Sequence, residues 1–172
     1  VALIKSNGEL SWVKQLGTPD RDQFLDVVYH TQGVIFAGGF STGDFDGQSN
    51  TQLMDGALVA LDEEGVVLWK KLLTLGMINR LLPTPTGVVV VGSYDQGGGD
   101  QAAYIASYDM NGERRWLHTL NSPDLDSATS VTLVNEMLYV SGFSFGSVVE
   151  QINRSHMEMF VAALTLEGDE VW

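Results

Sequence analysis

The five-residue motif Gly-x-x-x-Trp recurs through this chain of 172 residues and accounts for every tryptophan in it. Its four copies are Gly8–Trp12, Gly65–Trp69, Gly112–Trp116 and Gly168–Trp172. The tryptophans lie 57, 47 and 56 residues apart. A recurrence at this period predicts a chain built from one repeated supersecondary unit, and it constrains the fold more than any other feature of the sequence.

Each unit contains four short segments that have the composition of β-strands. In the first complete unit these segments include 24–29, 34–38, 57–61 and 67–73. They are rich in β-branched and aromatic residues, as strands of about five to seven residues are. Later copies of the second and third segments lie at 88–92, 137–142, 104–108 and 160–164.

Turns that mostly contain glycine separate these segments. Asn7-Gly8 and Asn111-Gly112 predict two-residue hairpin turns, because both residue types tolerate positive φ. The other units have Glu64-Gly65 and Glu167-Gly168 at the same place, so the third and fourth strands are expected to form a hairpin in every unit. The first and second strands are joined at Gln32-Gly33, Thr86-Gly87 and Asn135-Glu136.

Four strands in a period of roughly 50 residues predict an all-β fold, a β-propeller of four-stranded antiparallel blades. A β-sandwich is the main alternative, because it also has short strands at regular spacing, but it gives no reason for four copies of one Gly-x-x-x-Trp motif. The tryptophans are expected to pack between neighbouring sheets, as large aromatic side chains usually do. A stacking site for a sugar or a planar cofactor is the alternative.

The stretch from Asp55 to Trp69 resembles the bacterial seven-bladed β-propeller repeat (SBBP) family, and residues 103–112 and 16–38 resemble the same pattern. The Gly-x-x-x-Trp element is also similar to the docking motif of PQQ-type propellers, including the outer-membrane assembly lipoproteins. These resemblances imply a propeller that is usually extracytoplasmic in bacteria. They imply no single activity, because one fold hosts many functions.

By analogy with propellers, the first strand of each unit is innermost and the tryptophan strand is outermost. Residues 24–73, 79–120 and 128–172 then form three blades, and residues 1–16 form the outer half of a preceding blade. Propellers typically have about four to eight blades, so the sequence predicts either a fragment of a longer chain or a ring that an oligomer completes. In the second unit Pro83 and Pro85 predict a short or distorted first strand, because proline cannot donate to a ladder.

The chain is strongly acidic: 22 Asp and Glu residues oppose 9 Lys and Arg residues, and the net charge is −13. This balance excludes nucleic acid and anionic membrane surfaces as partners, because both require clustered basic residues. The chain has no cysteine, so it forms neither disulfides nor thiolate metal sites. No apolar run approaches the ~20 residues that membrane insertion requires.

Half of the carboxylates lie in the segments that connect the second strand to the third and one unit to the next. In antiparallel blades these segments share one face. The residues are Asp20, Asp22, Asp44, Asp46, Asp55, Asp95, Asp100, Asp124, Asp126, Glu150 and Glu158. Long loops on a rigid scaffold commonly carry binding sites. The acidic face is interpreted either as a solvating surface that keeps the protein soluble or as a site for a basic partner or Ca²⁺.

Asp44, Asp46 and Asn50 place hard oxygen ligands around Gly47, which suits calcium, although the loop lacks the terminal Glu of an EF-hand. Calcium is the one cofactor that the sequence suggests. Asp22 and Asp126 each precede a first strand, which favours a role as acceptors of backbone N–H bonds in a turn over metal binding.

The expected function is non-enzymatic: a secreted, cell-surface or periplasmic bacterial scaffold that binds protein through its acidic loop face. The sequence has no nucleophile elbow, phosphate loop or dinucleotide fingerprint. One alternative is a carbohydrate-active or PQQ-type propeller enzyme with its site at the central channel, where Arg80 is the one clear cation of the inner strands. Another is a structural spacer in a large adhesin. Expected partners are a protein, further propeller blades or further copies of the chain.

Overall fold

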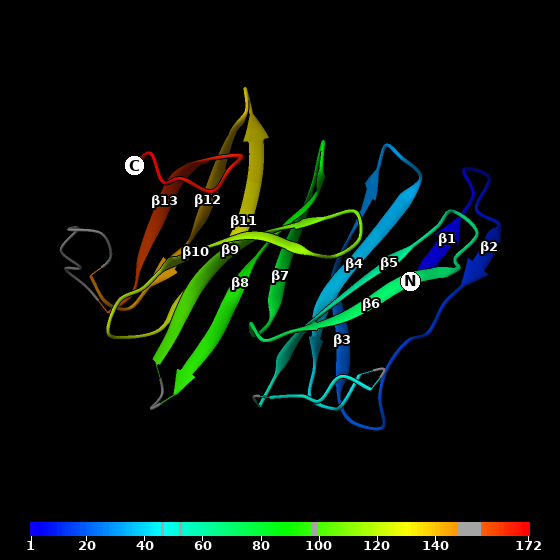
Figure 1. The fold of residues 1–172 in the computed structure, drawn as a ribbon, viewed down its shortest axis with the longest axis horizontal. Coiled ribbons are helices and arrows are strands. Elements are labelled where there is room, and N and C mark those ends of the chain that lie inside the picture. Colours follow the sequence, from blue (N-terminus) through cyan, green and yellow to red (C-terminus); the bar gives the residue numbers. More distant parts are fainter. Residues whose placement is uncertain (46, 52, 98–99, 148–155) are drawn as a thin grey trace.

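A computed structural model of the chain describes all residues except 46, 52, 98–99 and 148–155. The described residues form thirteen strands and no helix, arranged as four antiparallel sheets (Figure 1). Every sheet is a meander in which strands that follow one another in the chain lie side by side. This confirms the predicted all-β fold of antiparallel blades; the described sheets follow an open arc and do not close into a ring.

The N-terminal hairpin consists of β1 (Ala2–Ile4) and β2 (Leu10–Val13). The first blade consists of β3 (Asp22–His30), β4 (Val34–Ser41), β5 (Asp55–Leu61) and β6 (Val67–Leu73). The second blade consists of β7 (Ile78–Thr84), β8 (Gly87–Gly97), β9 (Asp100–Asp109) and β10 (Arg114–Leu120). The third blade consists of β11 (Asp126–Val134), β12 (Met137–Ser144) and β13 (Glu158–Thr165).

The third blade ends in a short segment that pairs with β13 in place of a full fourth strand. Glu170 forms a bridge with Leu164, and the main-chain N–H of Ala163 donates to the carbonyl of Trp172 at 2.8 Å. The segments predicted as blades, 24–73, 79–120 and 128–172, therefore each fall on one sheet, and residues 1–16 contain the N-terminal hairpin.

The hairpin turns that precede the tryptophan strands differ from the prediction. Gly8, Gly65, Gly112 and Gly168 all have positive φ, between 77° and 92°, but Asn7 and Asn111 do not. The N–H of Gly112 donates to the carbonyl of Asp109 at 3.0 Å, as in a three-residue loop whose last residue is left-handed. The prediction of two-residue Asn-Gly turns was therefore wrong. Only the glycine is required, which is why Glu64-Gly65 serves equally well.

The turn at Asn135-Glu136 is the two-residue type, because both residues have positive φ, 50° and 65°. The predicted shortening of the first strand in the second unit is also visible: β7 has seven residues, whereas β3 and β11 have nine. Pro83 lies in β7, which is the edge strand of its sheet. Because β7 has no neighbouring strand on its outer side, the missing N–H of Pro83 removes no ladder hydrogen bond on that side.

The hydrophobic core lies between the blades and not within one sheet. Phe36 and Leu58 of the first blade pack with Val90 and Tyr104 of the second. The opposite face of the second blade, which includes Ile105, packs with Leu138 and other residues of the third blade. The central strand β5 has packed side chains on both of its faces and is buried along its whole length.

A tryptophan joint connects each pair of neighbours in the arc. We use this term for an indole that covers the hairpin glycine of the next blade and donates through Nε1 to the carbonyl two residues before that glycine. The donor–acceptor pairs are Trp12–Glu63, Trp69–Met110 and Trp116–Leu166, each at 2.8 Å. A Cβ atom on Gly65, Gly112 or Gly168 would lie only 2.8, 3.1 or 2.5 Å from the indole. The glycine is thus required both for its φ and for the space that the indole fills.

Candidate functional site

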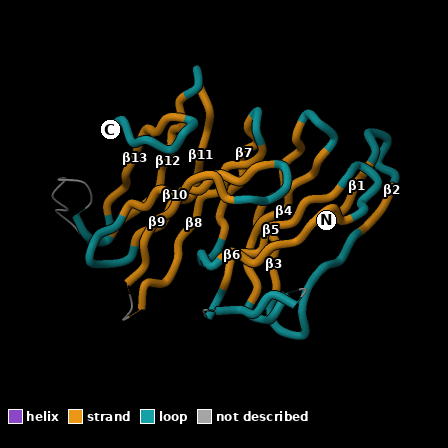
Figure 2. Tube along the Cα trace, in the orientation of Figure 1, coloured by secondary structure: helices purple, strands orange, loops and turns teal. Residues whose placement is uncertain are grey.

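The two kinds of connection lie at opposite ends of the strands (Figure 2). The turns between the first and second strands and between the third and fourth strands lie at one end, the turn edge. The loops between the second and third strands and the connections between blades lie at the other end. This second end is the loop face, and it carries the acidic residues that the sequence singled out.

Three of these aspartates hold turns of the loop face by accepting bonds from a residue four positions earlier. Asp126 accepts from the main-chain N of Ser122 at 2.5 Å and from its Oγ at 3.0 Å. Asp22 makes the same pair of bonds with Thr18, and Asp55 makes them with Thr51. Asp126 and Asp55 are buried, with 0% and 1% exposure. Their carboxylates are therefore occupied in folding, which agrees with the expected turn role of Asp22 and Asp126.

A second element, Ser-x-Gly, closes the same face in the first and third blades. Ser41 Oγ donates to the carbonyl of Gly43 at 3.1 Å and accepts from the N–H of Gly43 at 3.2 Å. Ser144 and Gly146 repeat these bonds at 2.8 and 3.1 Å. The spacing Thr/Ser-x-x-x-Asp is visible in the sequence and would have found the first element; Ser-x-Gly is too common a pattern to stand out.

The exposed carboxylates of the loop face have a different arrangement. Asp20 and Asp124 lie two residues before the acceptors Asp22 and Asp126, and both are exposed. Neither side chain has a hydrogen bond or an ion pair within the described part of the chain. Asp44 and Asp95 are also exposed, although each accepts one backbone N–H, from Asn50 and Gly97. The loop face thus exposes all four carboxylates, although Asp44 and Asp95 also hold backbone bonds of their own loops.

The calcium prediction remains untested. Asp46 lies outside the described residues, and so does Glu150 of the acidic set. Asp44 Oδ1 accepts from the N–H of Asn50 at 2.8 Å, and Asn50 Nδ2 donates to the carbonyl of Ser41 at 2.8 Å. These bonds close the loop on itself. The described residues contain no group of three or more His, Asp or Glu that could hold a metal ion.

The inner strands are joined by polar side chains. Asp26 on β3 accepts from the N–H of Leu81 on β7 at 2.8 Å and lies 3.8 Å from the guanidinium of Arg80. Asn79 on β7 donates to the carbonyl of Ala128 on β11 at 2.8 Å. Arg80, the cation predicted to line a central channel, is therefore paired with a carboxylate of the neighbouring blade.

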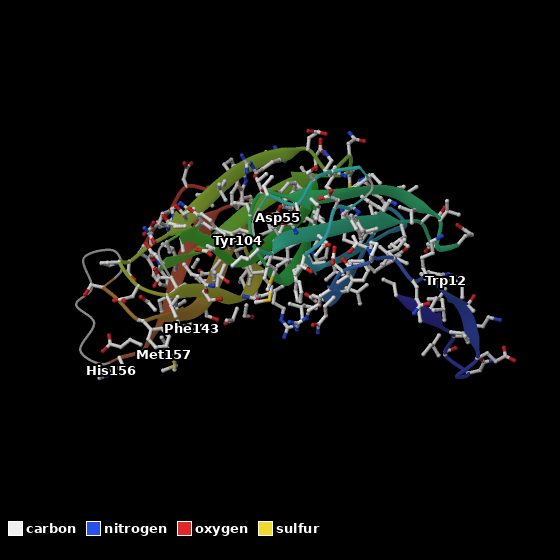
Figure 3. All side chains as sticks on the ribbon, turned by 90° about the horizontal axis from the view of Figure 1, so that it is seen from below. Trp12, Asp55, Tyr104, Phe143, His156 and Met157 are labelled. Carbon is white, nitrogen blue, oxygen red and sulfur yellow. The ribbon has the colours of Figure 1, made fainter. Side chains whose placement is uncertain are left out.

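Two of the three histidines take part in contacts between blades. His30 Nε2 lies 2.8 Å from the carbonyl of Thr84 in the second blade. His118 Nε2 lies 3.0 Å from the carboxylate of Glu170 in the third blade, without hydrogen-bond geometry. His118 lies on the tryptophan strand β10, and its side chain is only 21% exposed. His156 is exposed (Figure 3).

Two tyrosines are enclosed between the first and second blades. Burial raises the pKa of Tyr104 well above its ordinary value, and its hydroxyl lies 3.4 Å from the carbonyls of Gly76 and Met77. Burial also raises the pKa of Tyr108 to about 12, although Arg114 opposes the shift. Both hydroxyls stay protonated at neutral pH, so these groups stabilise the packing between the blades and supply no charge.

A cavity of about 160 Å³ separates the N-terminal hairpin from the first blade. It is lined by Leu16, Phe24, Phe40 and Phe45, among others. A complete preceding blade would place its inner strands beside this hollow. Sites for small molecules usually measure about 300–1,000 Å³, so the hollow is better explained by the two-stranded hairpin than by a ligand.

Comparisons with known proteins give no identity for the chain. No protein-family model matches it, and no curated protein matches it in sequence. Within the described residues, no helix is long and apolar enough to cross a membrane.

Proposed function

We propose that the protein is a non-enzymatic scaffold that binds a basic protein through its loop face. The observation that carries this proposal is the pair Asp20 and Asp124, which occupy equivalent positions in two units and are exposed without an internal partner in the described structure. Asp44 and Asp95 extend the same acidic surface. Several exposed carboxylates on one face suit a partner with several Lys or Arg side chains.

The hydrogen-bonded turns at Asp22, Asp55 and Asp126 support binding over simple solvation. A solvating surface requires only charge, whereas this face holds its backbone with paired bonds at Asp22, Asp55 and Asp126. A fixed backbone lowers the entropy that a partner must overcome on binding. The resemblance to extracytoplasmic bacterial propellers favours a secreted, cell-surface or periplasmic location for this activity.

Binding to poly-lysine tests the proposal. Isothermal titration would compare the wild-type chain with a loop-face variant that carries Asp20→Asn, Asp44→Asn, Asp95→Asn and Asp124→Asn. Asparagine keeps the side-chain oxygen that the turns use, so this variant is expected to fold. The loop-face variant is expected to bind poly-lysine at least about tenfold more weakly, which corresponds to a loss of about 1.4 kcal/mol in binding free energy.

A matched control removes the same number of charges from the turn edge, through Glu64→Gln, Glu136→Gln, Glu167→Gln and Asp169→Asn. The control is expected to keep the wild-type affinity at an ionic strength of about 0.15 M, where charges more than about 8 Å apart are screened. An equal loss in both variants would show that only the net charge matters, and the proposal would be wrong. Absence of any binding to poly-lysine would also reject it.

A further inference from the structure

Each end of the arc carries one unfilled half of the tryptophan joint. At the N-terminal end, Gly8 has a φ of 86°, close to the other hairpin glycines, but a Cβ atom there would meet no described atom within 4 Å. At the C-terminal end, Trp172 is 60% exposed. Its ring contacts Tyr139 of its own blade, with centroids 6.2 Å apart. The chain therefore presents a glycine turn without an indole and an indole without a glycine turn.

The surfaces around these half-joints are apolar. On the N-terminal hairpin, Ile4, Leu10 and Val13 are 63%, 60% and 58% exposed. At the other end, Met159 and Val161 on β13 are 92% and 58% exposed. Figure 3 shows Trp12 on the hairpin at one end of the arc and Phe143 and Met157 at the opposite end, with both ends bent to the same side.

In the internal blades, the surfaces that correspond to these two ends are buried against a neighbouring sheet. Strand pairing places Ile4 and Leu10 opposite each other, as it places Leu61 and Val67 in the first blade. Leu61 is fully buried, and it packs with the N-terminal segment. At the same position in its sheet as Val161, Ile105 of the second blade is fully buried against the third blade. The two end surfaces thus correspond to the two sides of an interface that the chain already builds.

The charges at the two ends are opposite. Residues 1–16 contain two lysines and one glutamate, although the chain as a whole has more than twice as many acidic as basic residues. Residues 126–172 contain seven acidic residues and one arginine. Attraction between these segments favours contact between unlike ends and disfavours contact between like ends.

We propose that the N-terminal hairpin of one copy of this chain docks on the third blade of a second copy, with Trp172 covering the Gly8 turn. The indole N–H donates to the carbonyl of Ser6, which stands two residues before Gly8 as Glu63 stands before Gly65. Such an interface joins unlike surfaces, so it forms a ring when the rotation closes. Because each chain has four tryptophans, two chains would close a ring of eight joints, and propellers have about four to eight blades.

The test is the mass of the 172-residue chain in solution. Sedimentation equilibrium across a range of protein concentrations is expected to show a dimer whose association weakens with salt. Trp172→Ala and, separately, Ile4→Glu are each expected to lower the association constant about tenfold or more, as loss of a central contact does. Leu68→Ala, which removes an exposed leucine of the first blade away from both ends, is the control and is expected to leave the dimer intact.

Mixing the two variants separates head-to-tail docking from any other dimer. A Trp172→Ala copy keeps an intact Gly8 turn, and an Ile4→Glu copy keeps an intact Trp172, so the mixture is expected to form a heterodimer through one joint. Circular dichroism of each variant checks that it is folded. A chain that stays monomeric at all concentrations overturns the proposal, and so does a dimer that both variants leave unchanged. These results do not depend on poly-lysine binding.

Discussion

The indole Nε1 of Trp69 donates a hydrogen bond of 2.8 Å to the main-chain carbonyl of Met110, which lies in the next blade. The same ring lies against Gly112, two residues beyond that carbonyl. One side chain therefore fixes both the distance between two blades and the place of a hairpin turn. Because the relationship recurs at Trp12 and Trp116, the chain repeats an interface as well as a unit.

Truncation of Trp69 to alanine is expected to destabilise the protein far more than truncation of the adjacent Leu68. Trp69→Ala should lower the free energy of unfolding by about 3–5 kcal/mol, the usual cost of truncating a large core aromatic. Leu68→Ala, at the adjacent position that is 51% exposed, should change it by less than about 0.5 kcal/mol. Urea unfolding followed by circular dichroism measures both values. Similar values for the two variants would contradict the joint as a source of stability.

Two hairpin glycines allow the effect of the indole contact on stability to be measured separately from the effect of positive φ. Gly65 and Gly33 both have a φ of 80° and lie in the same blade. A Cβ atom would lie 2.8 Å from Trp12 at Gly65, but its nearest neighbour at Gly33 is the Glu63 carboxylate at 3.9 Å. Both Gly→Ala variants should therefore show the same backbone strain. Gly65→Ala should cost about 1–3 kcal/mol more, the cost of overpacking, in urea unfolding. Equal costs would show that only φ selects the glycine.

The buried and exposed aspartates of one turn make a matched pair. Asp126→Ala removes two bonds from Ser122 and leaves its polar groups buried, so it should lower the free energy of unfolding by about 3 kcal/mol. Asp124→Ala, two residues earlier, removes an exposed carboxylate and should change stability by less than about 0.5 kcal/mol. Thermal unfolding of both variants is the measurement. A large loss from Asp124→Ala would show that the exposed set also has a structural role.

The sequence predicted the architecture because one glycine and one tryptophan mark every unit. Spacing alone did not show that Trp69 packs against Gly112 of the next unit and not against Gly65 of its own unit. The loop face was predicted in part. A place before a first strand predicted the acceptor role of Asp22 and Asp126, but Asp55 precedes a third strand and was not separated from the other acids, although it makes the same pair of bonds with Thr51.

Replacement of Glu136 by glycine in the Asn135-Glu136 turn is expected to stabilise the protein. Glu136 has a φ of 65°, and a left-handed conformation costs a residue with a Cβ atom about 1–2 kcal/mol. Glu136→Gly should therefore stabilise the protein by about 1 kcal/mol, since Asn-Gly is the preferred pair for this turn. Glu136→Ala removes the same charge but keeps the Cβ atom, so it should give no gain. A gain of equal size from both substitutions would assign the effect to charge.

Alkaline pH should weaken the packing of the first blade on the second. Burial raises the pKa of Tyr108 to about 12 and raises that of Tyr104 well above its ordinary value, so the unfolded chain loses these protons near pH 10 while the folded chain keeps them. The contribution of the two buried hydroxyls to the free energy of unfolding is fully present below about pH 10. It is lost as the pH rises above about 10, by about 1.4 kcal/mol per pH unit for each group. Urea unfolding at about pH 9 and about pH 11 should therefore show a steeper decline for the wild type than for the Tyr104→Phe/Tyr108→Phe variant, which loses both ionisable hydroxyls. Parallel declines in the two proteins would place the alkaline sensitivity elsewhere in the chain.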